Sequence, residues 1–380
     1  MGGIVCLMKK ILIIRTYPSI LDPEGYNIQE IGLAKALVRA GFLCDVVLYN
    51  AGNPDEVRQI PVSGTVAGLV KVYMRHGFGI LKNGFFPGLN HIVKDYDILQ
   101  VHEYDQITSW KYYACYKDKP VVIYHGPYYD EFNKGYNLKC KIFDKTFLKI
   151  RSGKSTLCFT KSKAAAAFLK GKGFENAVSI GVGLDTENFE DSVPVTDSDD
   201  KFELLYVGKI EERRNPYLLL NILDKLSEKY DDIHMTIIGS GEKDYINAWR
   251  QKANKLIEKG TLTYIEKMSQ SKLRAFYKKS DLMVFPSFYE IFGMVLLEAM
   301  YFDLPVISSD NGGSDTLITD GFDGMIVKSF DADTWCESIS KLHDDTEMYK
   351  IIKNNLILKD HAVYTWDGIA RRYIDTIKDL

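Results

Sequence analysis

The chain has 380 residues, of which 46% are hydrophobic and 26% charged, and its formal net charge is −3. This is the composition of an ordinary globular protein; it excludes a disordered chain and gives no general basic footprint for nucleic acid. No apolar run approaches the ~20 residues that cross a bilayer. The length exceeds what one hydrophobic core usually organises, so we expect two domains.

The first half alternates short apolar strands with amphipathic helices. The expected elements are, in chain order, a strand within 9–18, a helix over 27–41 closed by Gly41, and strands at 44–50, 97–103 and 120–127. Strands that alternate with helices favour a parallel sheet covered on both faces. The first half is therefore predicted to be Rossmann-like.

The same alternation restarts after a polar, acidic, proline-containing stretch at 190–200, which is the best linker candidate. Strands are expected at 202–210, 233–241, 262–268, 281–287, 304–310 and 324–329, with helices between them and an amphipathic helix near the end at 365–380. We therefore predict a Rossmann-like domain at 1–189, a linker at 190–200, a second Rossmann-like domain at 201–362 and a terminal helix at 363–380. Two such halves are expected to leave a ligand cleft between them.

The cysteines and the first residues indicate a cytoplasmic, metal-free protein. Six cysteines lie far apart, with no CxxC pair and no neighbouring histidine cluster, so reduced and buried side chains are expected. Lys9 and Lys10 follow the first apolar stretch, and the ILII sequence after them reads as a buried strand, so the start is a poor secretory signal. Met8 is an alternative initiator.

One segment is unusually basic. Residues 1–190 hold 24 Lys and Arg against 18 Asp and Glu, and residues 134–154 alone carry seven basic residues and one acid, together with Tyr136, Phe143 and Phe147. A solvated helix face is one interpretation. The other is a patch that meets an anionic acceptor or an anionic membrane surface.

Three short motifs carry little information. GKST at 153–156 resembles the end of a phosphate-binding P-loop, but Leu148 stands where its first glycine is required. GSG at 239–241 lacks the third glycine of a dinucleotide fingerprint and predicts only a tight turn after a strand. Asp95 and Asp97 look like a DxD metal motif, yet a turn that enters the strand at 97–103 is the better interpretation.

The strongest constellation is FPSFYEIFGMVLLEAM at 285–300. Glu290 follows a strand, Gly293 opens a helix, and Glu298 lies within it; were the segment from Glu290 to Glu298 all helical, it would span about 12 Å. A helix N-terminus offers N–H groups to a diphosphate, and the carboxylates can accept hydrogen bonds from sugar and ribose hydroxyls. The alternative is a core helix with solvent-facing glutamates.

A second element, at 206–220, places Gly208 and Lys209 just after a strand and Arg214 just before a helix. Two cations at such a junction can hold a pyrophosphate and stabilise a leaving group without a metal. Glu211 and Glu212 beside them keep a solvated charged turn open as the alternative.

These two elements, in this order, resemble family 4 of the retaining glycosyltransferases, which have the GT-B fold. The family's Glu-x7-Glu pattern matches Glu290 to Glu298, and its G-[RK]-x4-[KR] element matches Gly208-Lys209 to Arg214. The stretch 304–327, the YHG at 124–126, the stretch 180–189 and the closing helix are similar as well. In this fold the closing helix crosses back to the first domain.

The resemblance implies roles for these positions. Lys209 and Arg214 would hold the donor diphosphate, Glu290 the transferred sugar and Glu298 the ribose. The backbone around the donor would come from Phe292, Gly293, Met294 and Val295, beside Gly208. His125 would contact the donor sugar near the reacting carbon, with a histidine that caps a strand end as the alternative. Gly25 would bring a loop close to the phosphates.

The sequence departs from the family at two places. Glu24, Gly25 and Tyr26 stand where two adjacent glycines are common, and Thr316 stands where a glutamate usually follows the Gly312-Gly313 pair. The region around Thr316 is therefore left out of the predicted site.

The implied activity is metal-independent transfer, with retention, of a hexose-type sugar from a nucleotide-diphosphate sugar to a hydroxyl acceptor. The family favours bacterial-type surface glycan or glycolipid assembly, with the protein cytoplasmic or peripheral at the inner face of a membrane; no nucleic acid partner is expected. A nucleotide-sugar epimerase of the same fold and a non-catalytic sugar-nucleotide-binding protein are the alternatives.

Overall fold

The structure is a computed structural model that describes residues 9–64, 68–186, 201–378 and 380. The chain divides into two compact units, Met1–Asp185 with Ala362–Leu380, and Thr186–His361. The linker predicted at 190–200 lies outside the described residues.

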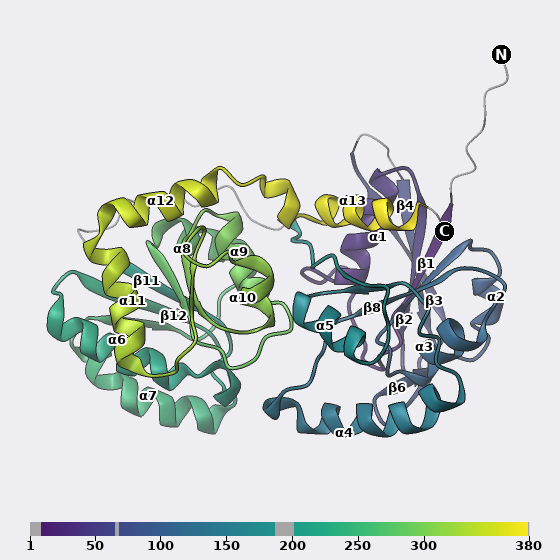
Figure 1. Ribbon diagram of the computed structural model, residues 1–380, viewed down its shortest axis with the longest axis horizontal. Coiled ribbons are helices and arrows are strands. Elements are labelled where there is room, and N and C mark those ends of the chain that lie inside the picture. Colours follow the sequence, from purple (N-terminus) through teal and green to yellow (C-terminus); the bar gives the residue numbers. More distant parts are fainter. Residues whose placement is uncertain (1–8, 65–67, 187–200, 379) are drawn as a thin grey trace, which may run out of the picture. The chain divides into compact units, whose positions relative to one another are not determined.

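The first unit is built on an eight-stranded sheet with the order β10-β9-β8-β7-β1-β2-β4-β3 (Figure 1). Its neighbouring strands are parallel except for β3, which pairs antiparallel with β4. The strands are β1 (Lys10–Ile14), β2 (Leu43–Tyr49), β3 (Glu56–Val62), β4 (Gly68–Arg75), β7 (Ile98–His102), β8 (Val121–His125), β9 (Cys158–Thr160) and β10 (Ala177–Ser179). A separate hairpin pairs β5 (Phe78–Ile80) with β6 (Asn83–Phe85). The central strand β1 is apolar at every position from Ile11 to Ile14, as a strand covered on both faces requires.

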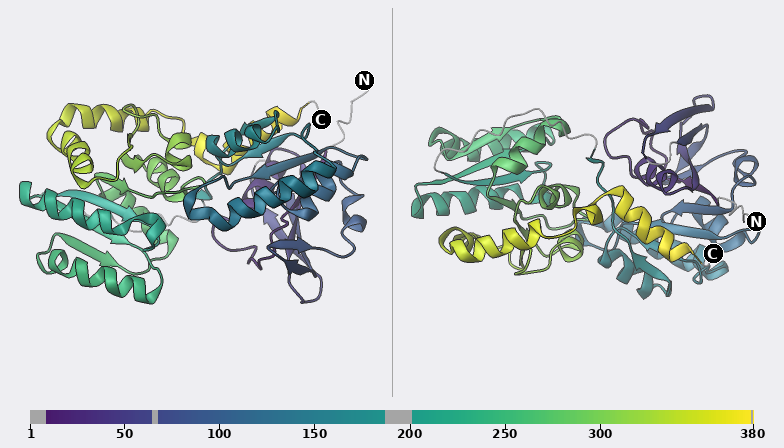
Figure 2. Two further views of the ribbon diagram at one scale, coloured as in Figure 1. Left: turned by 60° about the horizontal axis from the view of Figure 1, so that its bottom comes forward. Right: turned by 90° about the horizontal axis from the view of Figure 1, so that it is seen from above.

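The helices of this unit include one from the end of the chain. They are α1 (Gln29–Arg39), α2 (Asn90–Val93), α3 (Ile107–Trp110), α4 (Lys134–Phe143), α5 (Lys163–Gly171) and α13 (Trp366–Ile377). The terminal helix α13 lies beside α1 (Figures 1 and 2). A Cβ on Gly32 of α1 would lie 2.1 Å from Nε1 of Trp366, so only glycine admits the indole here. The return of the closing helix to the first unit is thus built into α1.

The second unit holds a six-stranded parallel sheet with the order β13-β12-β11-β14-β15-β16. Its strands are β11 (Phe202–Val207), β12 (Ile233–Ile238), β13 (Leu262–Ile265), β14 (Leu282–Phe285), β15 (Val306–Ser309) and β16 (Met325–Val327). Its helices are α6 (Pro216–Lys229), α7 (Lys243–Glu258), α8 (Gln270–Lys279), α9 (Met294–Tyr301), α10 (Gly312–Leu317), α11 (Ala332–Asp344) and α12 (Thr346–Ile357). Strands and helices alternate in both units, which confirms the predicted Rossmann-like architecture.

The periodicity did not predict the strands between residues 56 and 85. In β3 every residue from Glu56 to Gln59 is exposed, because the strand lies at the sheet edge. An edge strand whose two faces are both solvated over four residues carries no alternation of apolar and polar residues there.

Candidate functional site

The two motifs predicted to bind a donor follow neighbouring parallel strands. β11 ends at Val207, β14 ends at Phe285, and the two strands pair directly. Carboxyl ends of parallel strands open on the same edge of a sheet, where α/β proteins bind ligands. The loops after β11 and β14 therefore share one edge of the second unit.

The loop after β11 carries the basic residues. Gly208 and Lys209 come directly after the strand, and Lys209 is exposed, with no carboxylate partner in the described part of the chain. A 3-10 turn over Glu212–Arg214 and the left-handed residue Asn215 (φ 53°) then lead into α6. Helix α6 begins at Pro216, whose fixed φ suits a first helical position. Arg214 thereby stands just ahead of a helix, as predicted.

The segment 239–241, predicted as a tight turn, is not a turn: it follows β12 and runs alongside the basic loop, with a parallel bridge between Gly241 and Ile210. A Cβ on Gly239 would lie 1.7 Å from the carbonyl oxygen of Gly208, and one on Gly241 would lie 2.1 Å from that of Ile210. The amide of Ile210 donates to the carbonyl of Ser240 at 3.0 Å. The two glycines thus serve a close approach of two backbone segments.

Arg214 and Glu290, predicted from separate motifs, are in contact. Nη1 of Arg214 forms an ion pair with Oε1 of Glu290, and the Ser287 hydroxyl donates to the same oxygen at 3.0 Å. Glu290 is only 5% exposed. Burial lowers the pKa of Arg214 to about 10, so the guanidinium remains charged at neutral pH. A buried cation and a buried carboxylate therefore lie together at the sheet edge.

Arg213, which the motifs did not single out, ties the two loops together. Its Nη1 donates to the carbonyl of Tyr289 at 2.8 Å and lies 3.5 Å from Oε1 of Glu290, while its Nη2 lies 2.9 Å from Glu211. The amide of Phe288 donates back to the carbonyl of Arg213 at 3.0 Å. Arg213 is thus the residue that fixes the 3-10 turn against the loop that carries Glu290.

Helix α9 begins directly after Gly293, whose φ of 77° is left-handed. The segment from Glu290 to Glu298 is not helical throughout, because α9 starts only at Met294; Glu298 lies one turn into it. The Glu298 side chain is 2% exposed, and its Oε2 accepts a hydrogen bond from the Tyr277 hydroxyl at 2.7 Å. Phe292 precedes this helix start, and Met294 and Val295 are the first two residues of α9.

The stretch around Thr316 packs against the loop that carries Glu290. A Cβ on Gly313 would lie 2.5 Å from the carbonyl oxygen of Phe292. Asn311 caps α10 through the amides of Gly313 and Ser314, and the Ser309 hydroxyl donates to the carbonyl of Ser287 at 2.5 Å. This region therefore holds the loop between Ser287 and Phe292 in place through hydroxyl, amide and backbone contacts.

In the first unit, His125 ends β8 and is held by a carboxylate. Its Nδ1 lies 2.5 Å from Oε2 of Glu103, which also accepts from the Gly126 amide at 3.2 Å. The His125 side chain is fully buried, and its ring stacks on Phe168 with centroids 5.7 Å apart. A carboxylate on Nδ1 favours the tautomer in which Nδ1 carries the proton.

Glu103 directly follows β7 and has a left-handed φ of 62°, a conformation that costs a non-glycine residue about 1–3 kcal/mol. Burial raises its pKa, but the charge and hydrogen bond of His125, with Lys161 and His102, outweigh burial and lower the pKa to about 2. The sequence signal that could have found Glu103 is its place at the carboxyl end of a strand next to β8.

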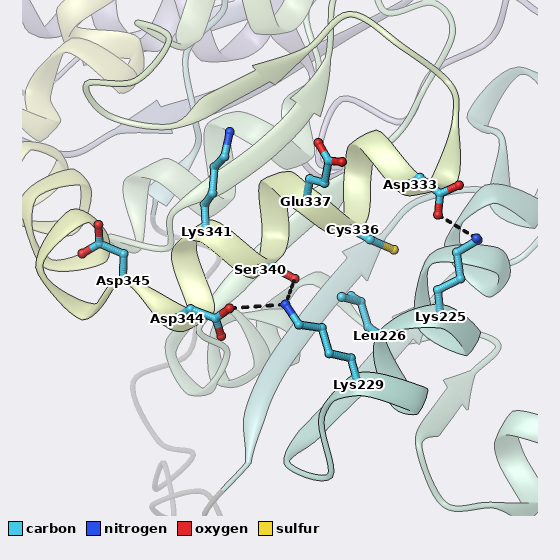
Figure 3. Close-up of a pocket in the computed structure, with 10 residues that line it drawn as sticks. All are labelled: Lys225, Leu226, Lys229, Asp333, Cys336, Glu337, Ser340, Lys341, Asp344 and Asp345. Carbon is cyan, nitrogen blue, oxygen red and sulfur yellow. Dashed lines mark hydrogen bonds and ion pairs between the residues drawn. The ribbon is translucent and has the colours of Figure 1, made fainter.

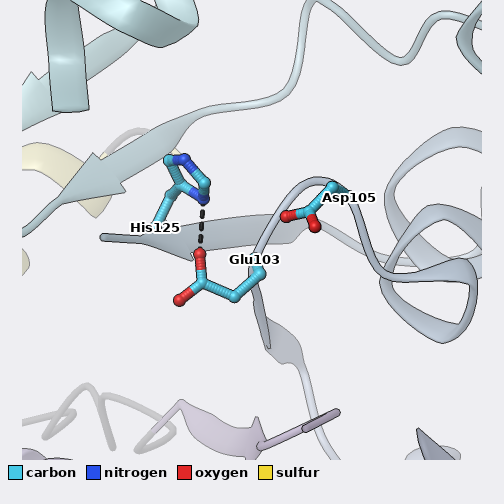
Figure 4. A group of neighbouring side chains, drawn as sticks. All are labelled: Glu103, Asp105 and His125. Atoms are coloured by element: carbon cyan, nitrogen blue, oxygen red, sulfur yellow. Dashed lines mark ion pairs between the residues drawn. The ribbon is translucent and has the colours of Figure 1, made fainter. Parts of the chain in front are cut away.

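Asp105 lies near this pair, and the ligand atoms of Glu103, Asp105 and His125 fall within 4.8 Å of one another (Figure 4). Both acids already have basic partners: Asp105 pairs with Lys139 at 2.8 Å, and Glu103 contacts Nδ1 of His125. We therefore interpret Glu103 and His125 as a positioned histidine–carboxylate pair.

The remaining predicted residues fall in expected places. Gly25 lies in the turn between β1 and α1, where its amide donates to the carbonyl of Asp22 at 2.9 Å. Asp97 accepts from the Lys10 amide at 2.8 Å, which confirms a turn at the strand entry. The predicted site residues thus divide between the units, Gly25 and His125 in the first and the others in the second.

A pocket of about 730 Å³ lies between α6 and α11 (Figure 3). Its charged residues pair with one another, Lys225 with Asp333 at 2.6 Å and Lys229 with Asp344 at 3.4 Å. The pocket holds no predicted site residue.

The basic segment 134–154 forms α4 and the turns after it. Cys140, Phe143 and Leu148 face the core, whereas three large apolar side chains are exposed: Leu138 (60%), Ile142 (56%) and Ile150 (76%). Six basic residues of the segment are exposed as well: Lys134, Lys141, Lys145, Lys149, Arg151 and Lys154. The outer surface, which we call the α4 surface, is both apolar and cationic. Nowhere in the described chain is a helix long and apolar enough to span a membrane.

Residues 188–358 match the family model of the group 1 glycosyl transferases. An uncharacterized glycosyltransferase of Methanocaldococcus jannaschii is 28% identical over 192 residues, 50% of this chain and 48% of that protein. A D-inositol 3-phosphate glycosyltransferase of Paenarthrobacter aurescens is 30% identical over 156 residues, 39% of this chain and 37% of that protein. The chain thus spans less than half the length of these curated relatives. The similarities support a glycosyltransferase.

Solved structures match nearly the whole chain. Alr3699/HepE of Anabaena, in complex with UDP, has a TM-score of 0.70 at 15% identity and covers 98% of this chain and 100% of its own. Sucrose-phosphate synthase of Thermosynechococcus elongatus has a TM-score of 0.70 at 17% identity, with 98% of each chain covered. The fold is GT-B. The fold class predicted from the sequence is therefore confirmed.

Proposed function

We propose that this protein transfers a hexose-type sugar from a nucleoside-diphosphate sugar to a hydroxyl acceptor, with retention of the anomeric configuration. The observation that carries the proposal is the contact of Arg214 with Glu290, beside the exposed Lys209 and the N-terminus of α9. Cations, a buried carboxylate and a helix N-terminus are three kinds of group that bind a sugar diphosphate. The ligands of the HepE complexes, UDP and UDP-glucose, agree with such a donor.

Each residue has a role in this proposal. Lys209 and Arg214 bind the diphosphate and stabilise the charge that grows on it as the sugar leaves. Glu290 accepts hydrogen bonds from the sugar, and Glu298 from the ribose. Donor binding exchanges partners, because Arg214 passes from Glu290 to phosphate while sugar hydroxyls take its place on the carboxylate.

The transfer is a front-face displacement without a protein nucleophile. The acceptor oxygen bonds to the anomeric carbon as the bond to the diphosphate oxygen breaks, and the acceptor proton passes to the departing phosphate. His125, oriented by Glu103, contacts the donor sugar near the reacting carbon. We propose that no metal takes part, because two cationic side chains supply the charge that a divalent ion would otherwise supply.

A donor screen tests the proposal. A bound donor raises the melting temperature by mass action, so at least one of UDP-, GDP- or ADP-glucose should stabilise the chain by several degrees. Arg214→Met should abolish that shift, whereas Arg250→Met, which removes an exposed arginine 3.9 Å from Glu266 in the same unit, should keep it. If a wider panel of sugar nucleotides leaves the wild type unshifted, the donor site is wrong. Incubation with the bound donor alone separates the alternatives, because an epimerase would convert it without acceptor.

We further propose that the acceptor lies at an anionic membrane surface, in the assembly of a surface glycan or glycolipid at the cytoplasmic face. The exposed leucine and isoleucines of the α4 surface among six exposed cations favour insertion beside anionic headgroups. Vesicles with anionic lipid should recruit the wild type at low salt, and Leu138→Glu with Ile142→Glu should prevent it. Ile351→Glu, at a 57% exposed isoleucine of α12, is the matched control. Equal recruitment of all three proteins would remove the α4 surface from the proposal.

A further inference from the structure

We infer that Tyr277 is a positioning residue that orients Glu298 and thereby gives the donor site its preference for ribose over 2′-deoxyribose. The inference rests on the proposed function, which assigns Glu298 to the ribose. It adds a residue from a different helix, α8, that the sequence motifs do not contain.

Tyr277 and α9 meet at two points. The Tyr277 hydroxyl donates to Oε2 of Glu298 at 2.7 Å, and the Tyr277 ring stacks on Phe302 with centroids 5.7 Å apart and planes 17° apart. Phe302 follows Glu298 by four residues, so both contacts come from one side of the helix end. Tyr277 is 1% exposed and Glu298 2%. The hydroxyl is therefore held by the packing of its ring, and it can hold the carboxylate in turn.

The Glu298 carboxylate needs such a partner to accept hydrogen bonds from the two neighbouring hydroxyls of ribose. A glutamate side chain has rotatable bonds up to its carboxylate, whose terminal torsion is broad, and its two oxygens offer about four acceptor directions. A donor fixed on Oε2 sets the plane of the carboxylate. Two ribose hydroxyls can then donate to a carboxylate that is already oriented, and little rotational freedom is lost when they bind.

Discrimination follows from the same geometry. A site built to accept a substrate hydroxyl rejects the analogue that lacks it, because the buried acceptor then keeps an unmet hydrogen bond. If the carboxylate can turn, it finds another donor and the penalty for the missing hydroxyl falls. Tyr277 should therefore matter for the ribonucleotide and hardly at all for the 2′-deoxyribonucleotide.

The test is a calorimetric cycle that needs neither acceptor nor turnover. Calorimetry measures the binding of UDP and of 2′-deoxy-UDP to the wild type, Tyr277→Phe and Tyr230→Phe. The same measurements are made with ADP and GDP and their 2′-deoxy analogues. Tyr230 is the matched control, because its hydroxyl also donates to a carboxylate in the second unit, that of Asp344, at 2.7 Å. Phe302→Leu, which removes the stacking ring but keeps the hydroxyl, is the second variant.

For the base that binds best, we expect the wild type to prefer the ribonucleotide by about tenfold or more. Tyr277→Phe should weaken the ribonucleotide about tenfold and change the deoxyribonucleotide less than twofold, so that the preference disappears. Phe302→Leu should reduce the preference for the ribonucleotide in part, and Tyr230→Phe should leave that preference unchanged. An equal loss for both sugars, or an unchanged preference, would show that Tyr277 only stabilises the fold. Failure of every diphosphate to bind the wild type would instead refute the proposed function, and this inference with it.

Discussion

The ion pair of Arg214 with Glu290 should be strongly coupled, and a double-mutant cycle measures the coupling. Glu290 is 5% exposed and Arg214 mostly buried, so removal of one partner leaves a charge in a poorly solvated place. Such removals cost about 3–5 kcal/mol. Here the cost should fall near the lower bound, because Arg213 lies 3.5 Å from the carboxylate and Glu211 lies 3.8 Å from Nε of Arg214.

We therefore expect Glu290→Gln and Arg214→Met each to lower the free energy of unfolding by about 3 kcal/mol. The double variant should lose about 2 kcal/mol less than the sum of the two. Urea unfolding followed by circular dichroism measures all four proteins. The exposed pair of Lys225 with Asp333 is the control cycle, and its coupling should fall within experimental error. Additive losses at Arg214 and Glu290 would refute the interpretation of a buried pair.

Three further predictions concern single residues. Gly239→Ala should destabilise the protein by several kcal/mol and weaken donor binding, because its Cβ would lie 1.7 Å from the Gly208 carbonyl; unchanged unfolding and binding would contradict this. Gly293→Ala should cost about 1–2 kcal/mol through its φ of 77°, measured by the same urea curves. The pKa of Glu103 falls from 4.5 to about 2 on folding, so its stabilisation is full above pH 4.5 and disappears as the pH falls towards 2. Glu103→Gln should flatten the stability profile across that window by about 3 kcal/mol, and a profile as steep as that of the wild type would refute the pairing with His125.

The fold was predictable because its strands and helices are short and locally consistent. The run from Ile11 to Ile14 is apolar throughout, as in a buried strand, and α13 carries the period of an amphipathic helix. The ordered motifs specify the GT-B fold. The edge strand β3 was not predictable, because it has little buried surface to impose a pattern.

The sequence assigned Arg214 and Glu290 to one candidate site from two separate motifs, and the structure places their side chains in contact. Partners that are close only in space left no such signal. Glu103 follows β7 and contacts His125 at the end of the neighbouring strand β8, and Tyr277 of α8 contacts Glu298 of α9. The motif singled out Arg214, but the role of its neighbour Arg213 in fixing the loop that carries Glu290 is visible only in the structure.

The position of α13 in the first unit affects how the chain is made. The Trp366 indole lies against Gly32 and donates to the Asn27 side chain at 2.9 Å, but the ribosome reaches it more than 170 residues after the sheet of that unit is complete. At typical rates of synthesis this delay is about ten seconds or more. The unit whose sheet is translated first is therefore the last to be completed. The surface of α1 at Gly32, which Trp366 covers, stays accessible to chaperones until α13 emerges. The unit that carries His125 can mature only in chains whose second unit has already been translated.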